Sequence, residues 1–130
     1  AALNFFGNNW SVAIATAFAG TALGLPALSS VAFNGVALGA IAALEENLAA
    51  LLAFVAPHGI FELPALFISG ALGIHLGIAS WRAFRGHLSR EGFADALERA
   101  FWVSIGVGVL IAVAAVIEGF VSPYYWRPFL

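Results

Sequence analysis

The sequence predicts an all-α protein, a bundle of transmembrane helices forming a single domain over residues 1–130. The chain is short enough for one domain, and 62% of its residues are hydrophobic. Only 9% are charged and the mean hydropathy is +0.98, whereas soluble domains average about 45–50% apolar and about 25% charged residues. A water-soluble fold of this size could not hide so much apolar surface.

Other classes of protein are excluded by charge and by residue usage. The formal net charge is −2 and the chain has no basic run, so nucleic acid is not an expected partner. Cysteine is absent, which excludes disulfides and thiolate metal sites. Methionine is also absent, so we expect that upstream residues of the full-length protein are missing.

Four spanning helices are predicted from the apolar segments, because a span needs about 20 mostly apolar residues. Ile60–Trp81 and Ala100–Val121 meet this length. Two shorter segments precede them, Trp10–Leu25 and a second helix that ends near Glu45, for which Ser29 or Ser30 offers a cap.

A short apolar stretch, Leu48–Ala56, precedes the helix breaker Pro57-His58-Gly59. Nine residues are too few to cross a bilayer. The stretch is therefore either the continuation of the second helix or a re-entrant or broken helix near Pro57, which membrane proteins tolerate where protein or water covers it.

Small residues recur four positions apart on two of the predicted spans, a spacing that lets helix backbones approach closely in lipid. The alternative is that alanine-rich helices produce this spacing by chance. The predicted helix-packing residues are Gly35, Gly39, Ser69, Gly73 and Gly77.

The stretch Arg82–Arg99 is the longest polar segment and holds Arg82, Arg85 and Arg90. Because cytoplasmic loops are enriched in arginine and lysine, we expect a multi-pass protein of the cell membrane with this loop in the cytoplasm. The same stretch predicts an amphipathic turn that lies on the membrane surface and runs into the fourth span. The Tyr124-Tyr125-Trp126 terminus is then expected at the outer interface.

Two carboxylates, Glu62 and Glu118, fall inside predicted spans at similar depth, toward the outer side. A charged carboxylate in apolar surroundings must pair, bind a cation, contact water or take up a proton. The alternative is that both are protonated or hydrogen-bonded supports of the helix ends, with Glu118 reaching to the interface.

Four further polar residues are candidate partners of these carboxylates. Asn34 lies within an apolar helix and is expected to support a neighbouring helix; Asn8 and Asn9 are expected to cap the first helix. His58 belongs either to a turn or to an i, i+4 pair with Glu62 that could hold a proton or a metal. The predicted intramembrane polar cluster is Glu62, Glu118, Asn34, His58, Asn8 and Asn9.

Catalytic residues, a cofactor and a metal site are not predicted. The chain has no nucleophile beside a base, no phosphate-binding glycine loop and no metalloprotease pattern. Two protein ligands are too few for zinc. We therefore expect a protein that is not an enzyme.

The sequence from Pro57 through Glu62 to Ala65, followed by Ile68-Ser69-Gly70-Ala71-Leu72-Gly73, resembles the stage II sporulation protein M family of prokaryotic integral membrane proteins. Further matching positions are Asn8-Asn9, Asn34-Gly35, Arg82, Ile117-Glu118-Gly119-Phe120 and Ser122-Pro123. The resemblance implies a scaffold or complex-forming component linked to cell-envelope remodelling, with other membrane proteins as partners. It also implies a further span ahead of the asparagine pair.

Two functions are therefore weighed. The first is a non-enzymatic scaffold in the lipid bilayer, assembled as a homo-oligomer, preferably a dimer, or with other membrane proteins of a cell-envelope complex. The alternative is a small proton- or cation-translocating transporter or channel that uses Glu62 and Glu118 with Asn34 and His58. The sequence favours the scaffold.

Overall fold

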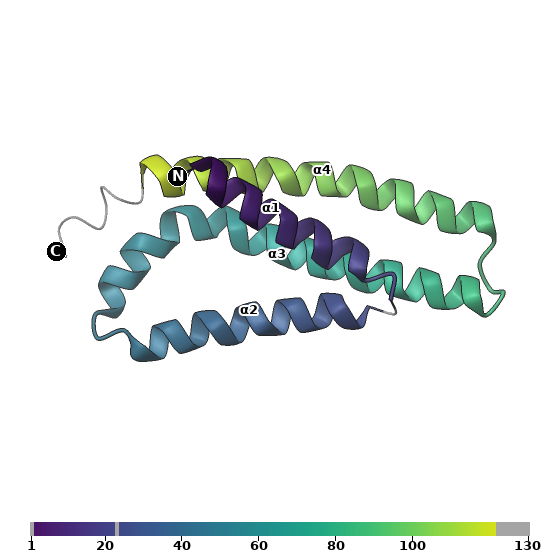
Figure 1. Cartoon of the computed structure of the whole chain (residues 1–130), viewed down its shortest axis with the longest axis horizontal. Coiled ribbons are helices and arrows are strands. Elements are labelled where there is room, and N and C mark those ends of the chain that lie inside the picture. The colour runs from purple at the N-terminus through teal and green to yellow at the C-terminus, as the bar shows by residue number, and fades with distance from the viewer. Residues whose placement is uncertain (1, 23, 122–130) are drawn as a thin grey trace.

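The protein is a bundle of four helices that run alternately up and down (Figure 1). The structure, a computed structural model, describes residues 2–22 and 24–121, without the side chains of Ala2, Phe5 and Phe54. The all-α prediction is confirmed. The helices are α1 (Ala2–Ala19), α2 (Leu25–Leu44), α3 (Leu48–Phe84) and α4 (Arg90–Phe120).

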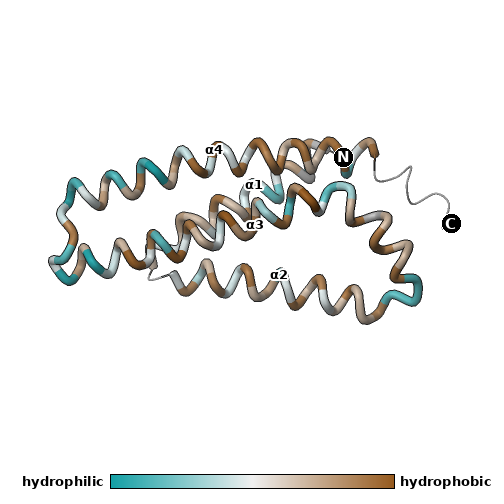
Figure 2. Tube along the Cα trace, turned by 180° about the vertical axis from the view of Figure 1, so that it is seen from behind, coloured by the Kyte–Doolittle hydropathy of each residue, from teal (hydrophilic) through white to brown (hydrophobic). Residues whose placement is uncertain are grey.

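The two ends of the bundle differ in the connections they carry (Figure 1). The start of α1, the α2–α3 loop and the last turn of α4 lie at one end, here called the loop end. The α1–α2 turn and the α3–α4 connection lie toward the opposite end. The tip of the α3–α4 connection is here called the arginine end. Hydrophilic positions concentrate toward these ends in Figure 2, and the middle of the helices is mainly apolar.

Three helices are long and apolar enough to cross a membrane: Leu25–Leu44, Val55–Phe84 and Arg90–Phe120. The protein is therefore an integral membrane protein. The predicted first span corresponds to α1, which is not among the three. It has 18 residues, and Asn4, Asn8 and Asn9 lower its hydropathy.

The first two helices begin earlier than the sequence predicted. Asn8 and Asn9 lie within α1, so their expected role as caps is wrong. Helix α2 begins after Gly24, whose φ is 76°, and has Pro26 in its first turn. A glycine in the left-handed region followed by an early proline starts this helix without a side-chain cap. Ser29 is inside the helix, where its hydroxyl donates to the Leu25 carbonyl at 2.9 Å.

Helix α3 continues through both of its prolines, Pro57 and Pro64, and the predicted break is wrong. Residues 48–56 are its first part, capped by the Asn47 side chain, and neither continue α2 nor form a separate re-entrant element. A proline inside a helix removes one backbone hydrogen bond and bends the chain, which membrane helices tolerate. The first part of α3 accordingly runs at an angle to the rest (Figure 1).

The α3–α4 connection is fixed by local hydrogen bonds. Gly86 has φ 74°; its N–H donates to the Ala83 carbonyl at 3.0 Å, and the His87 N–H donates to the Arg82 carbonyl at 2.8 Å. This is the pairing by which glycine ends a helix. Ser89 then caps α4 by accepting from the Gly92 N–H at 3.0 Å.

The polar stretch after this connection forms the first turns of α4. The helix runs without interruption from Arg90 to Phe120 (Figure 1). The stretch predicted as an amphipathic turn running into the fourth span is the beginning of this one helix, which Ser89 caps. Its place on the membrane surface stays a prediction. The Tyr124-Tyr125-Trp126 terminus lies outside the described residues.

Close helix contacts use glycine and alanine. Gly20, directly after α1, lies against the backbone of Gly73 of α3, which also meets Thr16 and Ala27. A side chain at either glycine would force these helices apart. Next to this contact Leu76 and Ala100 are fully buried between α3 and α4.

The predicted packing residues divide into two groups. Ser69, Gly73 and Gly77 are buried inside the bundle. Gly35 and Gly39 of α2 have open space where a side chain would stand, so none of the described helices packs closely against them there. Much of α2 is exposed because only one of its sides faces the other helices. A role for its glycines in packing between two copies of the chain stays a prediction.

Candidate functional site

A cavity of about 450 Å³ lies between α1, α2 and α3 in the half of the bundle near the loop end. Five polar residues line it: Asn8, Asn9, Asn34, His58 and Glu62. The remaining lining is mainly apolar and includes Ile111 of α4. The polar pocket, as we call it, thus gathers five of the six residues of the predicted polar cluster.

The bend of α3 accounts for the space. Pro57 and Pro64 bracket His58 and Glu62, and the part of α3 before them diverges from the axis of the rest (Figure 1). Gly59 adds no side chain to the lining. The prolines therefore give the pocket its room, and the residues between them supply its polar groups.

His58 and Glu62 lie four residues apart on one continuous helix. This spacing places both side chains on the same face, and both line the pocket. The alternative that His58 belongs to a turn is wrong. His58 is only 6% exposed and Glu62 is half-buried, so an imidazole and a carboxylate share a site that is partly shielded from the surroundings.

The asparagines enter the pocket from the two other helices. The Asn34 side-chain nitrogen donates to the Ser30 carbonyl of its own helix at 2.8 Å, so the expected bond to a neighbouring helix is not observed. The Asn8 side-chain nitrogen donates to the Asn9 side-chain oxygen at 3.3 Å. Amides offer both donors and acceptors, and they can solvate a charge without adding one.

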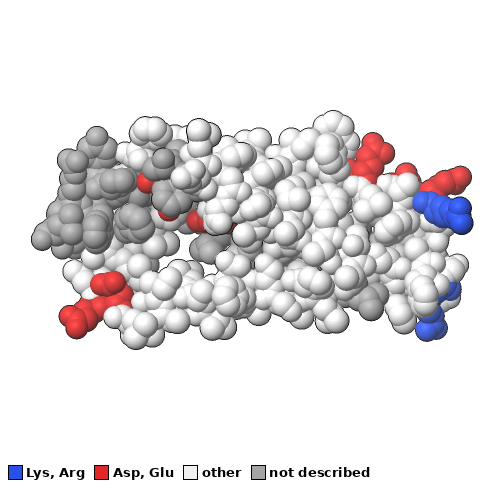
Figure 3. All heavy atoms as spheres, viewed as in Figure 1, with Lys and Arg blue, Asp and Glu red and all other residues white. Residues whose placement is uncertain are grey.

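Glu118 is the one member of the predicted cluster that does not line the pocket. It lies on α4 within electrostatic range of both His58 and Glu62. The two carboxylates therefore sit at the same level of the bundle. Figure 3 shows acidic atoms set in a hollow near the loop end of the visible face.

Among the described residues, the arginines are confined to the opposite end. All described arginines lie between Arg82 and Arg99, and the sequence contains no lysine. The fifth arginine, Arg127, lies outside the described residues. Within the described chain, His58 is the only basic side chain lining the pocket.

This arrangement has the chemistry to hold a proton or a small cation. A water molecule occupies about 30 Å³ in the liquid, so the pocket has room for several of them. Carboxylate and imidazole groups can exchange protons, and carboxylate and amide oxygens can coordinate a hard cation. No group of three metal-binding side chains occurs among residues 2–22 and 24–121.

Sequence reasoning missed some apolar members of the lining, such as Leu38 and Phe67. Leu38 follows Asn34 by four residues, a helical spacing that was available from the sequence. Phe67 follows Glu62 by five, and no spacing rule would have selected it.

Apolar helices that are long enough to cross a bilayer, with a polar pocket between them, are the features of a membrane protein. A family model described as stage II sporulation protein M matches residues 1–123. The chain belongs to this family, and the resemblance recognised in the sequence is confirmed.

One relative in the comparisons is an uncharacterized protein of Methanocaldococcus jannaschii. It is 30% identical over 124 residues, a match that covers 89% of this chain and 67% of the relative. No solved structure matches the chain.

Proposed function

We propose that this protein binds a proton or a small cation in the polar pocket and carries it across the membrane. The observation that carries the proposal is the convergence of Asn8, Asn9, Asn34, His58 and Glu62 on one cavity within a bundle of membrane-spanning helices. Ionisable groups at such depth are costly, and typically mark ion or proton pathways.

The charge balance of the pocket supports this proposal. Glu118 lies within electrostatic range of Glu62 and of the His58 imidazole. The described arginines lie at the opposite end of the bundle. Two carboxylates in a region of low polarity are stable only when a proton or cation offsets part of their charge. Uptake of such a species is thus favoured by the site itself.

The test is flux into liposomes that contain the purified chain. A pH gradient and gradients of Na⁺ or K⁺ are applied in separate assays, with an internal pH dye or a cation-sensitive dye as the readout. Wild-type protein is expected to raise the flux well above empty liposomes. Glu62→Gln removes the charge with little change in shape and is expected to reduce flux at least tenfold.

Glu46→Gln is the matched control. Glu46 is exposed in the α2–α3 loop at the same end of the molecule, so this variant makes the same change in charge outside the pocket. It is expected to conduct as wild type. Absence of flux under every gradient, or equal loss in both variants, contradicts the proposal.

The proposed orientation places the arginine end in the cytoplasm, because arginine is enriched on that side of membranes. Because the chain contains no cysteine, single cysteine substitutions can report the orientation in the membrane. In intact cells Glu46→Cys is expected to react with a membrane-impermeant thiol reagent, and His87→Cys only after permeabilisation. The reverse pattern would invert the orientation.

A non-enzymatic scaffold is the second candidate, favoured by the exposure of α2. Val36 is 72% exposed and Gly39 has open space around it. A second copy or another membrane protein could pack there through the small residues. Under this proposal Gly39→Cys forms a disulfide-linked dimer in membranes and Val109→Cys, exposed on α4, does not. Equal cross-linking of both variants would count against a specific interface.

A further inference from the structure

The hairpin of α3 and α4 extends past the two other helices at the arginine end (Figure 1). The α1–α2 turn is level with Ile74, since a side chain at Gly24 would stand 3.4 Å from the Ile74 Cα. Helix α3 continues for ten residues beyond Ile74, to Phe84, which is about 15 Å at 1.5 Å per residue. We call this projecting part, residues 78–97, the overhang.

One face of α3 changes in character along the overhang. Ile74 and Ile78 are exposed and aliphatic; they are followed at helical spacing by two exposed aromatic residues, Trp81 and Phe84, the latter 82% exposed. The Trp81 and Phe84 rings stack with their centroids 5.9 Å apart. The Arg85 guanidinium carbon then lies 5.5 Å from the centre of the Trp81 ring.

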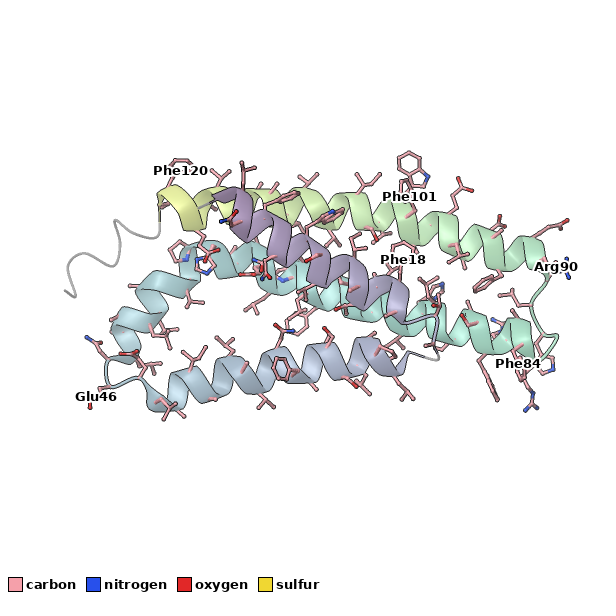
Figure 4. All side chains as sticks on the ribbon, viewed as in Figure 1. Phe18, Glu46, Phe84, Arg90, Phe101 and Phe120 are labelled. Carbon is pink, nitrogen blue, oxygen red and sulfur yellow. The ribbon has the colours of Figure 1, made fainter. Side chains whose placement is uncertain are left out.

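This order matches the layers of a lipid leaflet. Aliphatic side chains suit the acyl region, tryptophan and other aromatic rings suit the interface, and arginine suits the phosphate level. Figure 4 shows Phe84 near the tip of the overhang, beyond the start of α2. The α1–α2 turn stops short of this level, so α1 and α2 leave that side of the overhang uncovered.

The charges at the end of α3 are not balanced by acids of their own segment. Arg82 and Arg85 lie in a stretch, residues 63–90, that contains no aspartate or glutamate. Arg99 of α4, in contrast, has Asp95 and Glu98 close by in sequence. A phosphate group would supply negative charge beside these two arginines, and guanidinium groups bind phosphate through paired hydrogen bonds.

We propose that the end of α3 is a binding site for an anionic phospholipid. The phosphate lies between Arg82 and Arg85, the glycerol region lies against Trp81 and Phe84, and an acyl chain follows Ile78 toward the α1–α2 turn. Stacking on Trp81 holds the Arg85 guanidinium in place, so less side-chain freedom is lost on binding. This site is independent of the polar pocket and of the transport proposed for it.

Native mass spectrometry of the full chain in mild detergent tests the proposal. Phosphatidylglycerol and phosphatidylcholine of the same acyl chains are titrated in parallel, and free glycerol phosphate is added as a competitor. We expect phosphatidylglycerol to bind at least fivefold more tightly than phosphatidylcholine. Free glycerol phosphate is expected to displace it only weakly, because the acyl chain contributes to binding.

Two variants with equal change in charge locate the site. Arg85→Gln is expected to reduce the preference for phosphatidylglycerol about fivefold, the effect of one basic residue at a membrane surface. Arg99→Gln is expected to leave it unchanged, and Arg85→Lys to restore part of it. Both arginines are exposed, so neither variant is expected to disturb the fold.

Three results would overturn the proposal. Equal binding of the two lipids would show that the headgroup charge is not recognised. An equal loss in Arg85→Gln and Arg99→Gln would show a diffuse charge effect without a site. Full displacement by glycerol phosphate would show a simple phosphate site without a role for the apolar face.

Discussion

Toward the arginine end α1, α2 and α3 meet around glycine, whereas toward the loop end a pocket separates α2 from the packed helices α1, α3 and α4. Gly20 and Gly73 make the closest contact in the first half, and Pro57 and Pro64 bend α3 in the second. In lipid, helices associate by packing and not by hydrophobic burial. The comparison shows that the choice between glycine and proline on one helix decides where the bundle closes and where it opens.

The largest expected effect comes from filling the closest contact. In Gly73→Val the new side chain meets Ala27 and Thr16, which belong to two other helices, so α3 must move away from both. We expect a loss of about 3 kcal/mol or more in unfolding free energy, measured by titration with sodium dodecyl sulfate in mixed micelles. Gly39→Val, which faces open space, is the control and is expected to stay within about 0.5 kcal/mol.

A substitution at Leu76 tests the packing of the half toward the arginine end by removing side-chain volume instead of adding it. Its side chain is fully buried between α3 and α4. Leu76→Ala is expected to cost about 2 kcal/mol in the same assay, because the cavity loses packing contacts. Ile74→Ala, on the exposed face of the same helix, should cost much less. Similar losses in the two variants would mean that Leu76 is not part of a packed core.

A smaller effect is expected where α2 is attached to the closed half. The Thr16 and Ser30 hydroxyls are hydrogen-bonded across α1 and α2 at 2.7 Å. Thr16→Val keeps the shape and removes the bond, at an expected cost of about 0.6 to 1 kcal/mol. Ser29→Ala, whose hydroxyl bonds within its own helix, is the control. A larger loss of unfolding free energy in Ser29→Ala than in Thr16→Val would show that other contacts hold α2 against α1.

The smallest change is expected at Ser104, and with the opposite sign. Its hydroxyl oxygen is buried and has no hydrogen-bond partner among the described residues. Removing an unsatisfied buried hydroxyl relieves its desolvation cost. Ser104→Ala is therefore expected to raise the unfolding free energy by about 0.5 kcal/mol. A clear loss of stability would indicate a bound water or another partner at this hydroxyl.

The helical class and the membrane setting could be predicted from the sequence because long apolar runs have few alternatives in lipid. Helix ends were less predictable. The sequence placed a break at Pro57, but a proline in a long membrane helix bends it instead, and α3 runs on from Leu48 to Phe84. Ser30 was expected to cap a helix and instead bonds across to Thr16.

The composition of the polar pocket was partly predictable, because a polar side chain in an apolar helix needs a hydrogen-bond partner or water. Its shape was not. Asn34 and Glu62 lie on different helices, and only the bend of α3 sets the space between them. The contact of Gly20 with Gly73 could not be predicted either, because residue spacing along one helix does not indicate which helix lies opposite.

The overhang also changes the number of helices along the length of the bundle. Level with Ile74 and below, α1 and α2 stand beside the α3–α4 pair; above it, only that pair continues. At the arginine end the surroundings therefore meet two helices, whereas at the level of Ile74 they meet four.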